Sequence, residues 1–369
     1  MKLAIIGNPG FVDRSFEKKT EAIYAECGNN TGNLVFWHAF NGHVANIEKQ
    51  FYGFHFDPAA INKCDSLVFI LANHVNPSFD LGFLAERLDK VTVPVLAVGL
   101  GVQMPFGAEV GDLPQGSKDF FAVLARKASQ IGVRGETTKQ ALSRLGIDNV
   151  VVVGCISNFI ADKFASVLAA MDFRKAAFKS VLLNNDFINS VLPLSLLALA
   201  LFPRANFDFI VQAPIDLLRL TRNERERITP DYMATLRRAI QPFVARGESE
   251  EAILRRVFSP FDTSAWLEFV KRYDFAFGSR MHGNMVCFQA GVPTIFVAHD
   301  GRTAELLSTM ELPRIDIVAA SQITSREQLL DAVNFDPAAH LDRRSMLATR
   351  YRAMLAEAGL PRSALIDRI

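Results

Sequence analysis

The sequence is poor in cysteine, with four copies in 369 residues and no CxxC spacing among them. A zinc site or a disulfide framework would need a recognisable cysteine pattern. Cys27, Cys64, Cys155 and Cys287 each stand in an apolar or turn context, which indicates reduced, buried thiols. Histidines and aspartates also lack metal-ligand spacing, so the sequence predicts no metal site.

Long hydrophobic runs and an excess of one charge are missing as well. The longest uncharged apolar run, Val191 to Phe202, falls short of the roughly 20 residues that a membrane-spanning helix needs. The segment Met1 to Ile6 does not resemble an export signal, so we expect a cytoplasmic protein without a transmembrane segment. Forty basic and 39 acidic side chains leave a net charge of +1, which argues against nucleic acid as a partner.

Short apolar runs alternate with helix-like stretches, the pattern of parallel sheets covered by helices on both faces. Helices are predicted near Ser78–Asp89, Ser117–Lys127 and Thr137–Arg144. The first half has predicted strands at Leu3–Ile6, Ser66–Leu71, Val93–Val98, Gln130–Val133 and Val150–Val153. The second half has predicted strands at Ser180–Leu183, Phe207–Val211, Phe275–Phe277 and Thr294–Val297, with one more near Ile315.

The chain length favours two domains, because single cores usually stop growing below this size. We expect two Rossmann-like α/β domains, residues 1–173 and 174–369, whose parallel sheets face a central cleft. Ligands of such sheets bind at the carboxyl ends of the strands. The final helix, around Arg343 to Ala358, could pack on either half, and the charged run Thr221 to Arg227 predicts a solvated helix face.

The most informative stretch runs from Phe275 to Asn284, with the sequence Phe-Ala-Phe-Gly-Ser-Arg-Met-His-Gly-Asn. A strand here would deliver Arg280 and His282 into the turn that starts the next helix, where backbone N–H groups and the helix dipole favour an anion. Arginine adds a planar fork for phosphate or carboxylate, and histidine adds a proton donor that titrates near neutral pH. The pattern predicts a site for an anionic leaving group. The alternative is structural: Arg280 pairs with a carboxylate and His282 caps the turn.

A second candidate loop, Gly28-Asn-Asn-Thr-Gly-Asn33, precedes a helix-like run that contains Trp37 and His38. Its asparagines and glycines permit close approach to a hydroxyl-rich ligand, and Trp37 or His38 could offer a surface or a base. The alternative is a helix capped at Asn33 with Trp37 in the core.

Two further turns follow predicted strands. Gly99-Leu-Gly101-Val-Gln103 lacks the full dinucleotide fingerprint, so we expect a tight turn that lines the cleft rather than an NAD site. Arg134 also follows a strand, and both a ligand contact and an internal ion pair remain open for it.

The segment from Gly278-Ser-Arg-Met-His-Gly to Ala290-Gly-Val-Pro-Thr-Ile-Phe-Val-Ala-His-Asp300 resembles the signature of the polysaccharide pyruvyl transferase family. Members share an Arg-x-His turn followed by Gly or Ala, then a helix and a Gly-Val-Pro strand. Asn30-Thr-Gly-Asn33, the strand from Pro94 to Gly101, and Val133-Arg-Gly-Glu-Thr137 are similar to three other family motifs. The resemblance runs, with gaps, from Asn30 to Asp300.

The resemblance implies a fold similar to the B-type glycosyltransferases and a pyruvyl transfer from phosphoenolpyruvate onto a sugar or glycan as a ketal, with release of phosphate. Phosphoenolpyruvate would be a co-substrate, held by the second half, and no cofactor is implied. His282 and Arg280 would be catalytic. The implied donor-binding residues are Ser279, Arg280, His282, Gly283 and Arg302, and the implied acceptor-binding residues of the first half are Asn30, Gly32, Asn33, Trp37 and His38. Arg302 could equally be an ordinary exposed arginine at a helix start.

Three features depart from the family pattern. Many relatives carry Asp-Pro where this chain has Gly154-Cys155, and relatives often present an arginine where it has Asn184-Asn185-Asp186. An insertion-like stretch, Phe11 to Cys27, precedes the Asn-Gly loop. These departures keep two alternatives open: a glycosyltransferase of the same architecture that uses a nucleotide sugar, and a non-catalytic carbohydrate- or anion-binding protein. The oligomeric state is also open, a homo-oligomer included.

Overall fold

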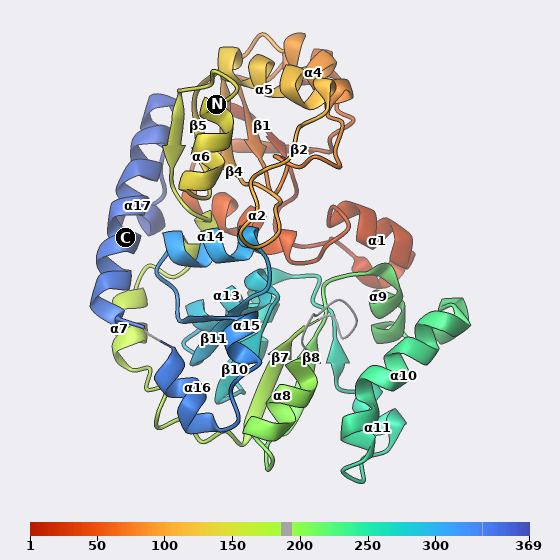
Figure 1. The fold of residues 1–369 in the computed structure, drawn as a ribbon. Helices are drawn as coiled ribbons and strands as arrows, with labels where there is room; N and C mark the ends of the chain where they lie inside the picture. The colour runs from red at the N-terminus through yellow and green to blue at the C-terminus, as the bar shows by residue number, and fades with distance from the viewer. Residues whose placement is uncertain (186–193, 334) are drawn as a thin grey trace.

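The computed structural model describes residues 1–185, 194–333 and 335–369, and its named strands form two six-stranded sheets with parallel pairing throughout (Figure 1). The predicted α/β class with two parallel sheets is confirmed. The first sheet has the order β2 (Glu48–Tyr52), β1 (Lys2–Ile6), β3 (Ser66–Ile70), β4 (Val95–Leu100), β5 (Ala128–Val133), β6 (Val150–Val152). The second has the order β12 (Arg314–Asp316), β11 (Thr294–Ala298), β10 (Phe275–Gly278), β7 (Ser180–Asn184), β8 (Asn206–Ile210), β9 (Val257–Phe258).

Helices connect the strands of each sheet. Those of the first half are α1 (Thr20–Glu26), α2 (Asn33–His43), α3 (Pro58–Ile61), α4 (Gly82–Asp89), α5 (Gln115–Lys127), α6 (Glu136–Ser143) and α7 (Phe164–Ala169). Those that follow are α8 (Leu194–Leu201), α9 (Ile215–Thr221), α10 (Pro230–Val244), α11 (Glu250–Leu254), α12 (Thr263–Val270), α13 (Met281–Gln289), α14 (Gly301–Thr309), α15 (Ile317–Ala320), α16 (Arg326–Ala332), α17 (Pro337–Glu357) and α18 (Ala364–Asp367). None of the described helices combines the length and apolarity needed to cross a membrane.

The central strands explain why the sequence predicts the sheets. Every residue of β3 and β4 is buried, so each reads as a continuous apolar run, as strands covered on both faces do. Two edge strands were not predicted. β2 is mostly polar and partly exposed along its length, and β9 has only two residues. Neither carries a hydrophobic pattern long enough to be recognised.

Helix α17 returns the chain to the first half, beside which it lies in Figure 1. Its buried residues Leu347, Tyr351 and Met354 belong to the same hydrophobic core as the first sheet. A Cβ atom on Gly132 in β5 would lie 3.1 Å from Met354 Cε, so strand and helix pack closely. The boundary between residues 173 and 174 stays a prediction.

The charged run from Thr221 to Arg227 begins at the end of α9 and is partly exposed, but several of its side chains also contact the first half. Arg227 Nη2 lies 2.6 Å from Glu21 Oε1, and Thr20 Oγ1 donates to Glu224 Oε1 at 2.6 Å. The run therefore joins the second half to α1 of the first half. Its partners stand about two hundred positions earlier in the chain, so no local pattern reveals them. Asp186 and the start of the run from Val191 lie outside the described residues.

Candidate active site

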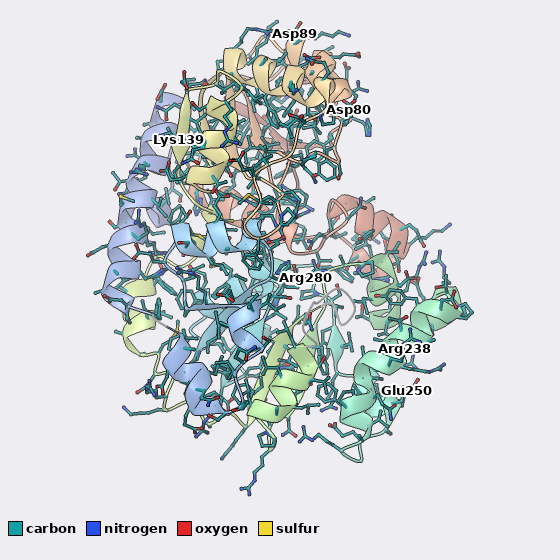
Figure 2. All side chains as sticks on the ribbon, in the orientation of Figure 1. Asp80, Asp89, Lys139, Arg238, Glu250 and Arg280 are labelled. Carbon is teal, nitrogen blue, oxygen red and sulfur yellow. The ribbon has the colours of Figure 1, made fainter. Side chains whose placement is uncertain are left out.

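A small cavity opens where the carboxyl ends of β10 and β11 face the carboxyl end of β5. Asn30 and Arg134 line it from the first half. The second half contributes Gln212, Ser279, Arg280, His282 and Arg302, among others. Arg280 lies at the junction of the two halves in Figure 2. The cavity lies at the edge where open α/β sheets bind ligands. It brings together six sequence-predicted residues from distant segments: Asn30, Arg134, Ser279, Arg280, His282 and Arg302.

The turn between β10 and α13 forms the floor of this cavity. Gly278 allows β7 and β10 to approach closely, because a Cβ atom there would lie 2.1 Å from Asn184 O. Arg280 N donates to Asn184 O at 3.1 Å, and Arg280 is the N-cap residue of α13. An arginine has no acceptor group and cannot cap a helix as an aspartate does. The positive end of α13 is therefore reinforced by a cation, which suits an anionic ligand.

His282 is the second residue of α13 and is mostly enclosed. Its Nε2 lies 3.6 Å from Cys155 Sγ, and its ring packs edge-on against Phe36 with 5.2 Å between centroids. Burial lowers the pKa of His282 well below its ordinary value, and the nearby guanidinium groups of Arg134 and Arg302 lower it further. The imidazole is therefore neutral at physiological pH when the site holds no anion.

Arg134 presents a buried cation to the same cavity. The residue is 3% exposed, and its Nε and Nη2 atoms have no hydrogen-bond partner. Its guanidinium carbon lies 5.7 Å from the centroid of the Phe36 ring, and burial lowers its pKa. Gly101 makes room for it, because a Cβ atom there would lie 2.8 Å from Arg134 Cδ. Buried polar groups are normally satisfied, so the two orphaned nitrogens point to a ligand.

Two neighbouring helices have carboxylates at their positive ends. Asp300 caps α14, accepting from Thr303 N at 2.7 Å, and also lies 3.4 Å from Arg302 Nε. Burial raises the pKa of Asp300, but Arg302, His299 and Thr303 outweigh burial, so the net shift is downward. Glu305 accepts from Thr138 N in the first turn of α6 at 2.8 Å, and burial raises its pKa. Both positive ends are thus already neutralised by the protein.

The predicted acceptor loop forms one edge of the cavity. Asn30 Oδ1 accepts from Gly32 N at 2.8 Å, and Asn33 Nδ2 donates to Cys27 O at 2.9 Å. Gly32 is the N-cap of α2, one residue before the predicted cap at Asn33. A Cβ atom on Gly32 would lie 2.1 Å from Gln212 Oε1, which explains the glycine. The contacts of Gly32 and Asn33 hold the loop together.

Seven predicted residues lie outside the cavity lining: Gly32, Asn33 and Gly101, described above, and Trp37, His38, Gly99 and Gly283. Trp37 is 7% exposed and belongs to the core, next to Gly7. His38 lies against Gly10, and burial lowers its pKa while Asp262 opposes the shift. Gly283 packs against Asn184 and Gln212, and Gly99 has a φ of +84° with its backbone against Leu71 O. Roles of these residues in ligand binding stay predictions.

Sequence reasoning missed Gln212 and Glu305. Gln212 is 2% exposed, lines the cavity and has an Nε2 atom without a partner. Its position two residues beyond β8 is the signal that could have found it, because strand ends carry the site residues of such sheets. Glu305 reaches α6 from α14, a contact that no local pattern predicts. Across the described ranges no group of three or more His, Cys, Asp or Glu side chains is arranged to hold a metal.

The model of the polysaccharide pyruvyl transferase family matches residues 6–301. The chain belongs to this family. The matched region contains Asn30, Arg134, Gln212, Ser279, Arg280 and His282 of the cavity lining, whereas Arg302 lies just beyond it. The match makes the chain a transferase with a pyruvyl transfer role on glycans. The resemblance predicted from the turn at Arg280 and His282 is confirmed at the level of the family.

The fold of this pyruvyl transferase family member is also similar to solved structures. UDP-N-acetylglucosamine 2-epimerase from Rickettsia bellii shares 10% identity over 97% of this chain and 96% of its own, with a TM-score of 0.45. The enzyme from Neisseria meningitidis, bound to UDP-GlcNAc, shares 11% over 96% and 100%, with a TM-score of 0.44. A wall teichoic acid polymerase shares 10% over 100% and 88%, with a TM-score of 0.37. Such low scores carry no inference about the ligand. No curated protein matches the chain.

Proposed function

We propose that the protein transfers pyruvate from phosphoenolpyruvate onto two hydroxyls of a sugar or glycan, forming a ketal and releasing phosphate. The observation that carries this proposal is the pairing of two cations across one cavity. Arg280 stands at the positive end of α13, and the orphaned nitrogens of Arg134 line the opposite wall. Phosphoenolpyruvate has two anionic groups, a phosphate and a carboxylate, which suits two separate cationic contacts.

The chain has Asn184 where relatives of the family often present an arginine, and this difference is compatible with phosphoenolpyruvate as the proposed donor. Where relatives present an arginine, Asn184 Nδ2 donates to Asn284 Oδ1 at 2.9 Å and Asn284 Nδ2 donates to Gly278 O at 2.6 Å. These bonds fix the start of α13 against β7. Arg134 and Arg302 supply cationic charge from the first half and from α14 instead.

The reaction balances without another reactant. The two sugar oxygens form bonds to the central carbon of the donor, and the bond from that carbon to the phosphate oxygen breaks. Of the two hydroxyl protons, one ends on the methylene carbon, which becomes a methyl group, and the other leaves with phosphate. Negative charge grows on the phosphate as it departs, so the fixed Arg280 and the N–H groups of α13 stabilise the transition state more than the ground state.

His282 is assigned to the proton transfers. Its pKa is low because burial and two guanidinium groups disfavour a third positive charge. A bound donor brings opposite charges that favour the imidazolium. The ring can then give the proton to the methylene carbon and later receive one from a sugar hydroxyl.

The direct test is to incubate the protein with phosphoenolpyruvate and candidate glycans, and to measure released phosphate and the mass of the modified glycan. His282→Ala should abolish turnover with the fold intact. His55→Ala is a matched control, because His55 is exposed and stacks on Phe83 away from the cavity. Wild-type rates in His282→Ala would contradict the role of this ring. Consumption of a sugar nucleotide in place of phosphoenolpyruvate would favour the glycosyltransferase alternative. The cytoplasmic location stays a prediction.

A further inference from the structure

A second, larger cavity lies between the carboxyl end of β1 and the carboxyl end of β9. One wall is residues 12–16, which follow β1 in the first half. The other wall is residues 257–262, together with Trp266 and Phe269 of α12. We call this cavity the aromatic groove. It lies at the carboxyl edges of both sheets, like the smaller cavity lined by Arg134, Arg280 and His282, which we call the donor cavity.

The aromatic groove is built by contacts that join the two halves. Val12 N donates to Phe261 O at 2.8 Å, and both N and Oγ1 of Thr263 donate to Gly10 O, at 3.1 and 2.9 Å. Arg222, which also lines the groove, donates from Nη2 to Lys18 O at 2.8 Å. The first wall is therefore held at one end by residues 261–263 and near its other end by Arg222.

The lining suits a sugar chain. The rings of Phe16, Phe258, Phe261 and Phe269 line the groove, and Phe16 is 78% exposed. Polar residues line the same groove: Asp13, Arg14, Ser15 and Asp262. A pyranose presents apolar C–H faces and a rim of hydroxyls, so a lining with both aromatic rings and polar groups matches both of its surfaces.

Two polar atoms in the wall also lack partners. Ser259 Oγ and Trp266 Nε1 are buried and make no hydrogen bond. Buried polar groups are satisfied in most folded proteins, and an unsatisfied one calls for a partner. A hydroxyl-bearing ligand can supply both an acceptor and a donor.

The aromatic groove is next to the donor cavity along the sheet edge. Ile210 lines the groove and Gln212, two residues later, lines the donor cavity. In the second sheet β9 is three strands from β10, which corresponds to roughly 14 Å at the usual strand spacing. A glycan whose terminal sugar reaches Arg280 and His282 can therefore extend its following sugars into the groove.

We propose that the aromatic groove is the acceptor subsite, which holds the sugars that precede the one receiving pyruvate. The inference rests on the proposed function. The first wall of the aromatic groove belongs to the stretch from Phe11 to Cys27, which departs from the family pattern. The groove therefore gives this chain an acceptor preference of its own. The charged run at Thr221 to Arg227 anchors the same stretch through α1.

The test is glycan binding measured without turnover. The wild type, Phe16→Ala and Phe261→Ala are applied to an array of neutral, acidic and amino-sugar oligosaccharides, and the affinity for each bound glycan is then measured by calorimetry. Each substitution should weaken binding about tenfold, because it removes a stacking surface. Phe83→Ala is the matched control: Phe83 is 38% exposed on α4, in the first half away from the groove, and its removal should leave binding unchanged.

The same proteins are titrated with phosphoenolpyruvate to separate this inference from the proposed function. Phosphoenolpyruvate should raise the unfolding temperature equally in Phe16→Ala and in the wild type. Equal glycan affinity in all four proteins, or no glycan bound by the wild type, would overturn the acceptor subsite while leaving the donor site standing. The wild type could also form a dimer that binds no glycan and that dissociates in Phe16→Ala. This result would assign the groove to a second copy of the chain and would also overturn the proposal.

Discussion

The turns after β10 and β11 are neighbours with the same strand, turn and helix order, yet they present opposite charges at the start of their helices. At α14 the N-cap is Asp300, whose carboxylate accepts from Thr303 N and completes a capping box. At α13 the N-cap is Arg280, which has no acceptor, and His282 follows in the first turn. The backbone of both turns can bind an anion, and at α14 the carboxylate of Asp300 takes that position.

The contrast predicts that the residue at the N-cap position, rather than the fold, decides which strand end suits an anionic ligand. The third positive end at this cavity, that of α6, is neutralised from α14 by Glu305. We therefore propose that an incoming anion binds at α13, because the positive ends of α14 and α6 already face carboxylates of the protein.

Arg280→Asp would make the α13 turn a copy of the α14 turn, and it has the largest expected effect. The new carboxylate should cap α13 and repel the donor, so phosphoenolpyruvate affinity should fall by about a hundredfold or more, while stability is kept or raised by about 1 kcal/mol. Calorimetry and urea unfolding measure the two quantities. Arg280→Lys, which keeps the charge, should lose less affinity. Retained donor binding in Arg280→Asp would mean that the anion binds elsewhere.

Asp300→Ala tests the other turn. Loss of the cap should lower the free energy of unfolding by about 1 kcal/mol, measured by urea unfolding. Because Arg302 loses its carboxylate partner but stays in place, donor affinity should change far less than in Arg280→Asp. A larger loss of donor affinity in Asp300→Ala than in Arg280→Asp would reverse the comparison.

The pH dependence of donor binding gives the smallest effect. The low pKa of His282 in the free protein means that the ring is neutral there, and a bound anion raises that pKa. The complex then binds more protons than the free protein, so affinity should rise as pH falls toward the ordinary histidine range, with uptake of up to one proton. Calorimetry in two buffers of different ionisation enthalpy measures the uptake, and His282→Asn reports the donor's own protonation. Identical uptake in both proteins would remove His282 from the proton transfers.

Local sequence predicted the parts of this structure that local chemistry determines. The buried strands β3 and β4 and the turn at Arg280 and His282 carry their patterns within a few residues. The neutralisation of α6 by Glu305 could not be predicted, since it depends on how two helices far apart in sequence pack.

The alternatives left open for single residues required the packing as well. Trp37 lies in the core, which is one of the two alternatives that the sequence leaves open for it. A role of Trp37 in ligand binding stays a prediction. For Arg134 the sequence could not choose between an ion pair and a ligand contact, because the choice depends on the space that Gly101 leaves and on which nitrogens find partners.

The most direct test of the anion site at α13 is a thermal-shift titration with phosphoenolpyruvate on the wild type and on Arg280→Ala in parallel. A ligand that binds only the folded state must raise the unfolding temperature. We predict a saturable rise in the wild type and none in Arg280→Ala. An equal rise in both proteins, or a rise only with a sugar nucleotide, would contradict the account.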